Sequence, residues 1–68
     1  MKYRVRTVKY IDAAITAEQS SDIATPFQMT AVGFVIKENH EFITLAQEVM
    51  SNGDFRGQIS IPIVAIIK

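Results

Sequence analysis

The sequence predicts a small, single-domain, mainly β protein, folded as a strongly bent antiparallel barrel of five strands. Apolar stretches rich in β-branched residues alternate with short polar turns from residue 29 to the C-terminus. A glycine lies inside one predicted strand, and a proline follows another. A chain of 68 residues has room for one domain only, so we assign residues 1–68 to a single barrel.

The first strand is predicted over residues 2–10, where charged residues alternate with Tyr, Val and Thr. Val8 and Tyr10 share the parity of the charged set, so we expect a bulge or the end of pairing near Thr7 or Val8. The alternation predicts that Tyr3, Val5 and Thr7 face inward and that Lys2, Arg4 and Arg6 face outward.

Residues 11–28 are small and polar, and an unstructured loop of this length would be unusual in so compact a domain. Thr16 and Gln19 fit a capping box, and Pro26 would end a helix. One reading is therefore one or two helical turns between Thr16 and Asp22. The alternative is an irregular surface loop anchored by Ile15, Ile23 and Phe27.

The second and third strands are predicted over residues 29–36 and 42–50, joined by a polar hairpin loop at residues 38–41. Gly33 weakens the second strand unless a bend or a close backbone approach requires it, as happens in small barrels. Both faces of the third strand are partly apolar. We therefore expect this strand to be covered on both sides, by the helical insert or by a neighbouring subunit.

The fourth strand is predicted from Phe55 to Ile61, after a turn formed by Asn52 and Gly53. Pro62 cannot donate a ladder hydrogen bond, so it should end this strand. A single helical-type turn and a short fifth strand over residues 65–67 would then close the barrel.

Composition indicates how so small a core is stabilised. The chain has no cysteine and one histidine, so neither disulfides nor a protein-only zinc site is expected, and no motif indicates a cofactor. Apolar residues make up 49% of the chain. One small core cannot bury so large an apolar share, so self-association remains as the way to stabilise the fold.

Charge and hydropathy restrict location and partners. Seven basic residues balance seven acidic residues, so no long-range field would attract polyanions to the whole molecule. Basic residues interrupt the apolar runs near the start of the chain, unlike a secretory signal, and no apolar stretch approaches the length needed to cross a bilayer. We expect a cytoplasmic protein without a membrane partner.

Catalysis is not expected. The acid cluster of Asp12, Glu18 and Asp22 has no histidine or cysteine near it in the sequence, and Thr16 and Ser20 lack a base partner. A solvated helical face explains these residues.

Three patches carry a resemblance: residues 31–36 around Gly33, the stretch Leu45-Ala46-Gln47-Glu48, and Ile61-Pro62 followed by Ile66-Ile67-Lys68. They resemble small proteins of bacteriophages and prophages that are similar in fold to Sm-like proteins, with a similarity extending from about Val5 onward. Sm-like barrels form rings in which the fourth strand pairs with the fifth strand of the next subunit. The resemblance implies a ring contact made by Phe55, Gly57, Ile59, Ile61, Ala65, Ile66 and Ile67.

The same resemblance implies RNA-contacting pore loops at Asn39 and His40 and at residues 62–64. The chain departs from the family here, because no asparagine stands beside Phe42 and the second motif is apolar instead of basic. Uridine binding by the family mechanism is therefore not expected. The long connection between the first two strands is closer to the first loop of SH3-like barrels.

Two functions remain open. The first is a structural or protein-interaction ring of identical subunits. The alternative is an RNA-binding ring. Each of its features has an ordinary explanation: the loop histidine can simply be solvated, the basic strand face can protect a sheet edge, and the aromatic residues can pack in the core. Its candidate nucleic-acid contacts are Lys2, Arg4, Arg6, Asn39, His40 and Arg56.

Overall fold

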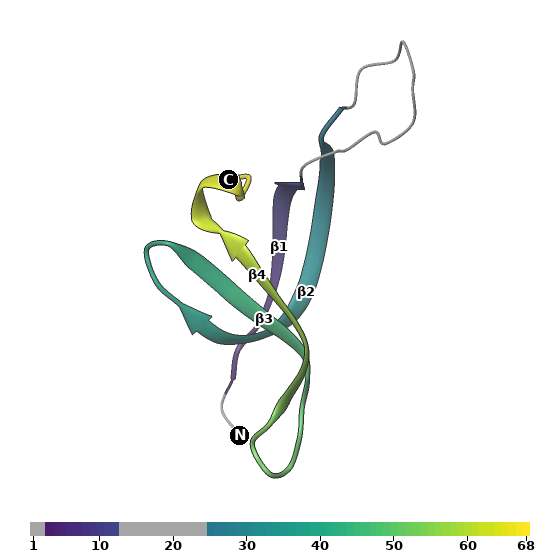
Figure 1. Cartoon of the computed structure of the whole chain (residues 1–68), viewed down its shortest axis with the longest axis vertical. Helices are drawn as coiled ribbons and strands as arrows, with labels where there is room; N and C mark the ends of the chain where they lie inside the picture. Colours follow the sequence, from purple (N-terminus) through teal and green to yellow (C-terminus); the bar gives the residue numbers. More distant parts are fainter. Residues whose placement is uncertain (1–2, 13–24) are drawn as a thin grey trace, which may run out of the picture.

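The computed structural model describes residues 3–12 and 25–68. Its strands form one antiparallel sheet in the order β1-β2-β3-β4, which confirms the mainly β prediction (Figure 1). The elements are β1 (Val5–Asp12), β2 (Phe27–Glu38), β3 (Phe42–Val49), β4 (Phe55–Pro62) and the short 3₁₀ helix η1 (Ile63–Ala65).

Strand β2 is shared by two hairpins. Its residues from Phe27 to Phe34 pair with β1, and its residues from Phe34 to Glu38 pair with β3. β1 and β2 run side by side, while the β3–β4 hairpin crosses them at an angle (Figure 1). The sheet therefore consists of two arms, β1–β2 and β3–β4, that meet around Gly33 and Phe34. We call the opening between these two arms the fork.

Gly33 allows this junction, as predicted from its position inside a strand. A Cβ atom at Gly33 would lie 2.8 Å from the carbonyl oxygen of Ala46 and 3.1 Å from Cβ of Leu45. The obstacle at the shorter distance is backbone, which cannot rotate away as a side chain can. The close approach of β2 to β3 thus depends on a residue without a side chain.

The bulge predicted in the first strand is absent, and that prediction is wrong. β1 and β2 pair without interruption from Val5↔Phe34 to Asp12↔Phe27. The irregularity lies in β2 instead, where the register with β3 shifts between Val35 and Lys37. A bulge at this point increases the twist just where β2 changes partner.

The predicted inward face of β1 is also wrong. Val8 is 2% exposed, whereas Val5 is 62% exposed, and Tyr3 and Thr7 are exposed as well. The core lies beside the second half of β1, so Val8 and Tyr10 supply its apolar contacts. Strand parity then places Arg6 on the same face as Val8 and Tyr10, and its long side chain extends away from the core to Glu38.

The core cluster is small. It contains Val8, Val35, Ile43, Leu45 and Ile61, against which Tyr10, Ala31, Ile63 and Ile66 pack. Residues 43–46 of β3 are all at most 6% exposed, so both faces of this stretch are covered, as predicted. A neighbouring subunit is not needed for this, because the burial is already present in the single chain.

The end of β4 follows the prediction, and the fifth strand does not. The helical-type turn after Pro62 is η1. Beyond it, Ile66 forms one isolated bridge with Tyr10, and the amide of Ile67 donates to the carbonyl of Lys9 at 2.8 Å. The prediction of a closed, five-stranded barrel is therefore wrong for the described residues. Ala65, the first residue of the predicted fifth strand, belongs to η1.

The helical turn predicted between Thr16 and Asp22 lies outside the described residues, as do Lys2, Glu18 and Ser20. Within residues 3–12 and 25–68, no helix is long and apolar enough to cross a membrane.

We expect Gly33→Ala to lower the free energy of unfolding by about 1–3 kcal/mol, because the new Cβ meets the Ala46 carbonyl. Urea denaturation followed by circular dichroism measures the change. Val32→Ala is the matched control: Val32 is the preceding residue and 59% exposed, so we expect a change within about 0.5 kcal/mol. Equal stability of both variants would show that the approach at Gly33 is not constrained.

Candidate functional site

The outer edge of β4 is open as far as the described residues go. The amide of Ile63 donates to the carbonyl of Glu41 at 2.9 Å, which orients the backbone of Ile63 toward β3. Backbone groups alternate sides along a strand, so Ile59 and Ile61 also face β3, and Gln58 and Ser60 face away from it. β4 is the last strand of the sheet, so these outward groups have no ladder partner in the described part of the chain.

The sequence analysis did not identify Gln58 and Ser60 as the residues whose backbone lies at the edge of the sheet, although the position of Pro62 indicates it. Proline is tolerated in a strand where its nitrogen faces away from the ladder. Residues of the same parity as Pro62 must then present their backbone at the edge. These are Gln58 and Ser60 rather than Ile59 and Ile61.

The predicted ring-contact residues of β4 have different environments. Ile61 is 1% exposed and belongs to the core, while Ile59 is 36% exposed. Gly57 has a φ of 68° and lies against the Gln47 side chain, which a Cβ at Gly57 would meet at 2.7 Å. Phe55 packs edge-on against Tyr3, with ring centroids 5.6 Å apart.

The C-terminal segment, residues 63–68, combines core contacts with exposed apolar side chains. Ile66 packs against the core, and Ala65 is partly buried. Val64 is 96% exposed and Ile67 is 38% exposed. This segment therefore presents apolar surface next to its single bridge to β1.

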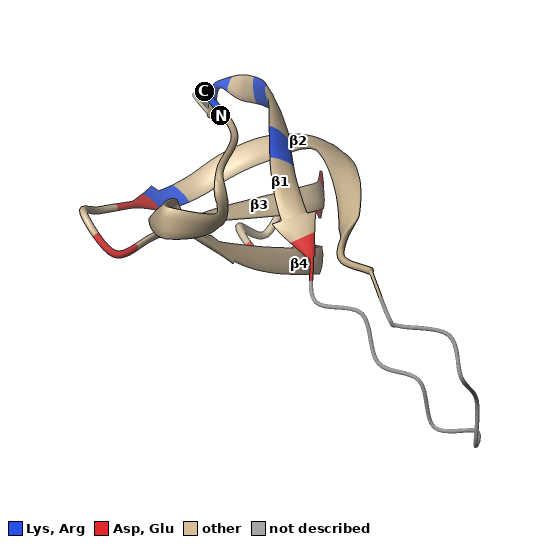
Figure 2. Ribbon diagram, turned by 90° about the horizontal axis from the view of Figure 1, so that it is seen from above, with Lys and Arg blue, Asp and Glu red and all other residues tan. Residues whose placement is uncertain are grey.

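Arg4 and Arg6, both candidate phosphate contacts, bind the same carboxylate. Their guanidinium groups lie 3.0 Å from Oε1 and Oε2 of Glu38, respectively. Figure 2 shows basic residues along β1 and acidic residues near the turn that joins β2 and β3. The structure brings the two arginines together, but with a counterion already between them. Such exposed ion pairs contribute at most about 1 kcal/mol to folding.

Arg56 is likewise paired, since its Nη2 lies 3.0 Å from Oε1 of Glu48 on the neighbouring strand. This pair and the Arg4–Arg6–Glu38 group belong to different hairpins. The structure thus does not join the described arginine candidates into one continuous basic stripe.

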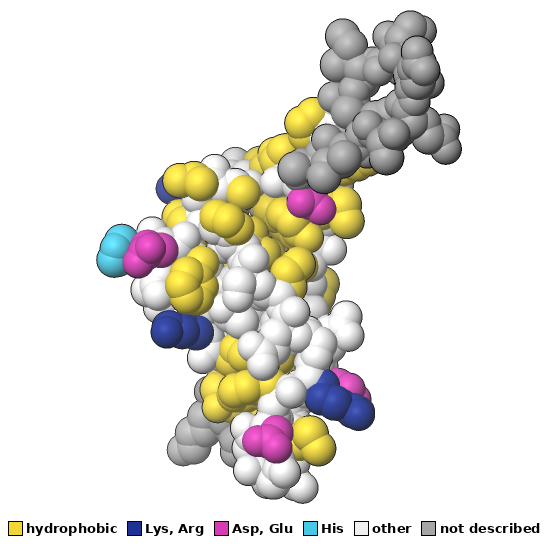
Figure 3. Space-filling view, in the orientation of Figure 1, with side chains coloured by type: hydrophobic (Ala, Val, Ile, Leu, Met, Phe, Trp, Pro, Cys, Tyr) yellow, Lys and Arg dark blue, Asp and Glu magenta, His cyan; other side chains and the backbone are white. Residues whose placement is uncertain are grey.

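Asn39 and His40 lie in the turn between β2 and β3, and they play different parts. Oδ1 of Asn39 accepts hydrogen bonds from the amides of Glu41 and Phe42 at 2.8 and 2.9 Å. This bonding shapes the turn. The His40 side chain is 91% exposed, with Nε2 3.9 Å from Glu41, and projects beside an acidic group at the margin of the molecule (Figure 3).

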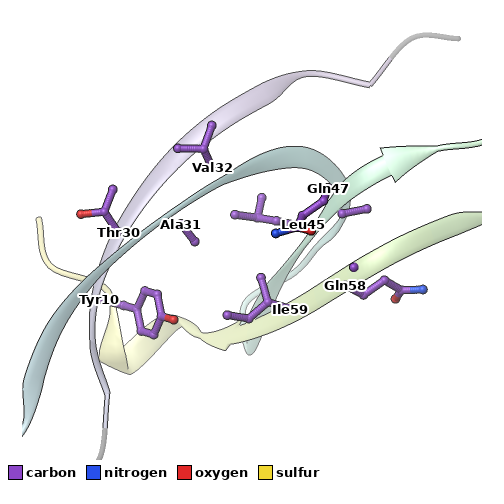
Figure 4. A pocket seen from close by; sticks show the side chains of 10 residues that line it. Tyr10, Thr30, Ala31, Val32, Leu45, Gln47, Gln58 and Ile59 are labelled. Atoms are coloured by element: carbon purple, nitrogen blue, oxygen red, sulfur yellow. The ribbon is translucent and has the colours of Figure 1, made fainter.

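A hollow of about 400 Å³ occupies the fork. Ala31 and Val32 line one side, Gln58 and Ile59 line the other, and Tyr10 lies at one end (Figure 4). Sequence reasoning did not anticipate this hollow, because its walls come from strands whose divergence depends on the contact at Gly33.

In residues 3–12 and 25–68, no three His, Cys, Asp or Glu side chains form a group that could hold a metal ion. Asp12 is described, but the other two acids of the predicted cluster are not. The structural features that stand out are open strand edges and exposed apolar side chains.

Comparison of the chain with protein-family models, with curated proteins and with solved structures finds no match.

We expect Glu38→Ala to raise the affinity for a single-stranded RNA oligonucleotide roughly tenfold at low salt, because Arg4 and Arg6 lose their shared carboxylate. The slope of log affinity against log salt should steepen by about one to two units. Fluorescence anisotropy across a salt series measures both. Glu48→Ala, which releases only Arg56, is the control and should have the smaller effect. An unchanged slope in Glu38→Ala would contradict a phosphate-binding role for Arg4 and Arg6.

Proposed function

We propose that this chain is a non-enzymatic, Sm-like subunit that assembles with copies of itself into a ring, in a structural or protein-interaction role. The edge of β4 in one subunit pairs with the C-terminal segment of the next. RNA binding is not part of the proposal, because the described arginine candidates already bind carboxylates.

The open edge of β4 is the observation that carries the proposal. Gln58 and Ser60 present backbone donors and acceptors outward, and Pro62 ends the row of donors. Natural proteins protect such edges with charge, bulges or a covering strand. Neither Gln58 nor Ser60 is charged, so a covering strand from another subunit is the fitting solution.

Exposed apolar side chains support the same conclusion. Among the described residues, large apolar side chains that are at least 36% exposed outnumber the buried ones. They include Ile59 in β4 and Val64 and Ile67 in the C-terminal segment. Pairing these two segments between subunits would remove apolar surface from water together with the open edge.

The C-terminal segment has the composition of a strand but lacks a full partner. Ile66 and Ile67 are β-branched, and among the described residues their contacts with β1 are the bridge to Tyr10 and the hydrogen bond to Lys9, while the amide of Ile66 donates to the carbonyl of Ile63 at 3.1 Å. Because Ile67 faces β1, the carbonyl of Ile66 and the amide of Lys68 face the other way. These groups can receive the edge of β4 from a neighbouring copy.

Gln58→Pro tests this pairing. We expect the variant to be a folded monomer near 7.6 kDa where the wild-type chain forms a larger oligomer, because the lost amide faces the neighbour and not β3. Multi-angle light scattering at micromolar concentration measures the mass, and circular dichroism checks the fold.

Gln58→Ala is the matched control and should keep the wild-type mass, since it preserves the backbone amide. Ile67→Lys gives a second route to the monomer that leaves β4 unchanged. A wild-type chain that is a stable folded monomer at micromolar concentration would refute the ring.

A further inference from the structure

Within residues 3–12 and 25–68, the β2 edge that faces the fork is a second open edge, independent of β4. The amide of Val35 donates to the carbonyl of Arg4 at 2.8 Å, so the backbone of Val35 faces β1. By alternation Met29 and Ala31 also face β1, whereas Gln28, Thr30 and Val32 face the fork. β3 pairs with β2 only from Phe34 onward, so it does not reach these three residues.

From this edge we propose that the fork binds an extended, uncharged peptide strand of a partner protein. The strand would add to β2 alongside Gln28, Thr30 and Val32. A row of alternating backbone donors and acceptors is complementary to another extended backbone. This complementarity selects a peptide strand over a compact small molecule.

The walls of the fork specify the side chains of the peptide. Every residue lining the hollow is uncharged. Tyr10, Leu45 and Ile59 give apolar contacts between β2 and β4, and Gln47 and Gln58 add amide groups near the other end (Figure 4). A charged side chain would lose water here without gaining a counterion. Aliphatic side chains at alternate positions of the peptide fit these walls.

A second copy of this chain fits the fork less well than a single strand does. Each described strand is already paired along at least one side. The edge of β4 or β2 from a second copy would bring its own hairpin partner into the space occupied by the opposite arm. A peptide from a partner protein has no such neighbour.

The binding test uses a fluorescein-labelled, amidated heptapeptide of alternating threonine and valine. In ¹⁵N-resolved NMR spectra of the full chain, we expect saturable downfield shifts of the Gln28, Thr30 and Val32 amide protons. The amides of Met29 and Ala31 should move less, because they already donate to β1. Fluorescence anisotropy gives the affinity.

Thr30→Pro removes an amide that faces the fork and leaves the β1 ladder intact, so we expect roughly tenfold weaker binding. Thr30→Ala is the matched control: it keeps the backbone amide, so it should bind the peptide more tightly than Thr30→Pro. Two altered probes test the same contact without changing the protein: a backbone N-methylated heptapeptide and one with lysine in place of valine. Neither should bind.

Three outcomes would overturn the proposal. The first is an absence of saturable shifts up to millimolar peptide. The second is shifts confined to Gln58 and Ser60, which would place the peptide on β4 instead. The third is shifts of Thr30 and Val32 that depend on protein concentration without peptide, which would show that a second copy fills the fork. The peptide site does not rest on the ring: Ile67→Lys, at a residue that does not line the hollow, should break the ring and leave peptide binding intact.

Discussion

The rest of the structure depends on the close contact between β2 and β3 at Gly33. A side chain there would meet the Ala46 carbonyl at 2.8 Å, so only glycine lets the two backbones approach without displacement. At this point β2 changes its partner from β1 to β3. Leu45 and Ala46, the residues nearest to Gly33, are almost completely buried. The contact therefore sets both the angle between the two arms and the position of the core.

Because the two arms diverge at this angle, some backbone edges are left unpaired. In the described residues β2 is open at Gln28, Thr30 and Val32, and β4 is open at Gln58 and Ser60. A core of five buried apolar side chains is small even for a domain of this length. Open edges and exposed apolar side chains are thus two consequences of the same geometry. The proposed assembly and the proposed peptide binding would both complete pairing that the described residues leave unfinished.

Local patterns predicted those features that depend on neighbouring residues. The turn residues Asn52 and Gly53 marked one hairpin, Gly33 marked the close approach, and Pro62 marked the end of β4. Features that depend on distant contacts were not predictable in this way. Charge alternation in β1 indicated the wrong inward face, because the position of the core selects Val8. The pairing of Arg4 and Arg6 with Glu38 joins residues far apart in the chain. The predicted fifth strand is absent because η1 includes Ala65, and residues 66 and 67 contact β1 through one bridge and one hydrogen bond.

Amide hydrogen exchange along β2, in dilute protein without any peptide, tests the change of partner at Gly33 most directly. The structure predicts an alternation before the junction, with Met29 and Ala31 protected by β1 and Thr30 and Val32 exchanging quickly. Beyond the junction, Phe34 should be protected by β3 and Val35 by its bond to Arg4. Uniform protection from residue 28 to residue 32 in a monomeric chain would contradict the account, because it would mean that the fork is closed.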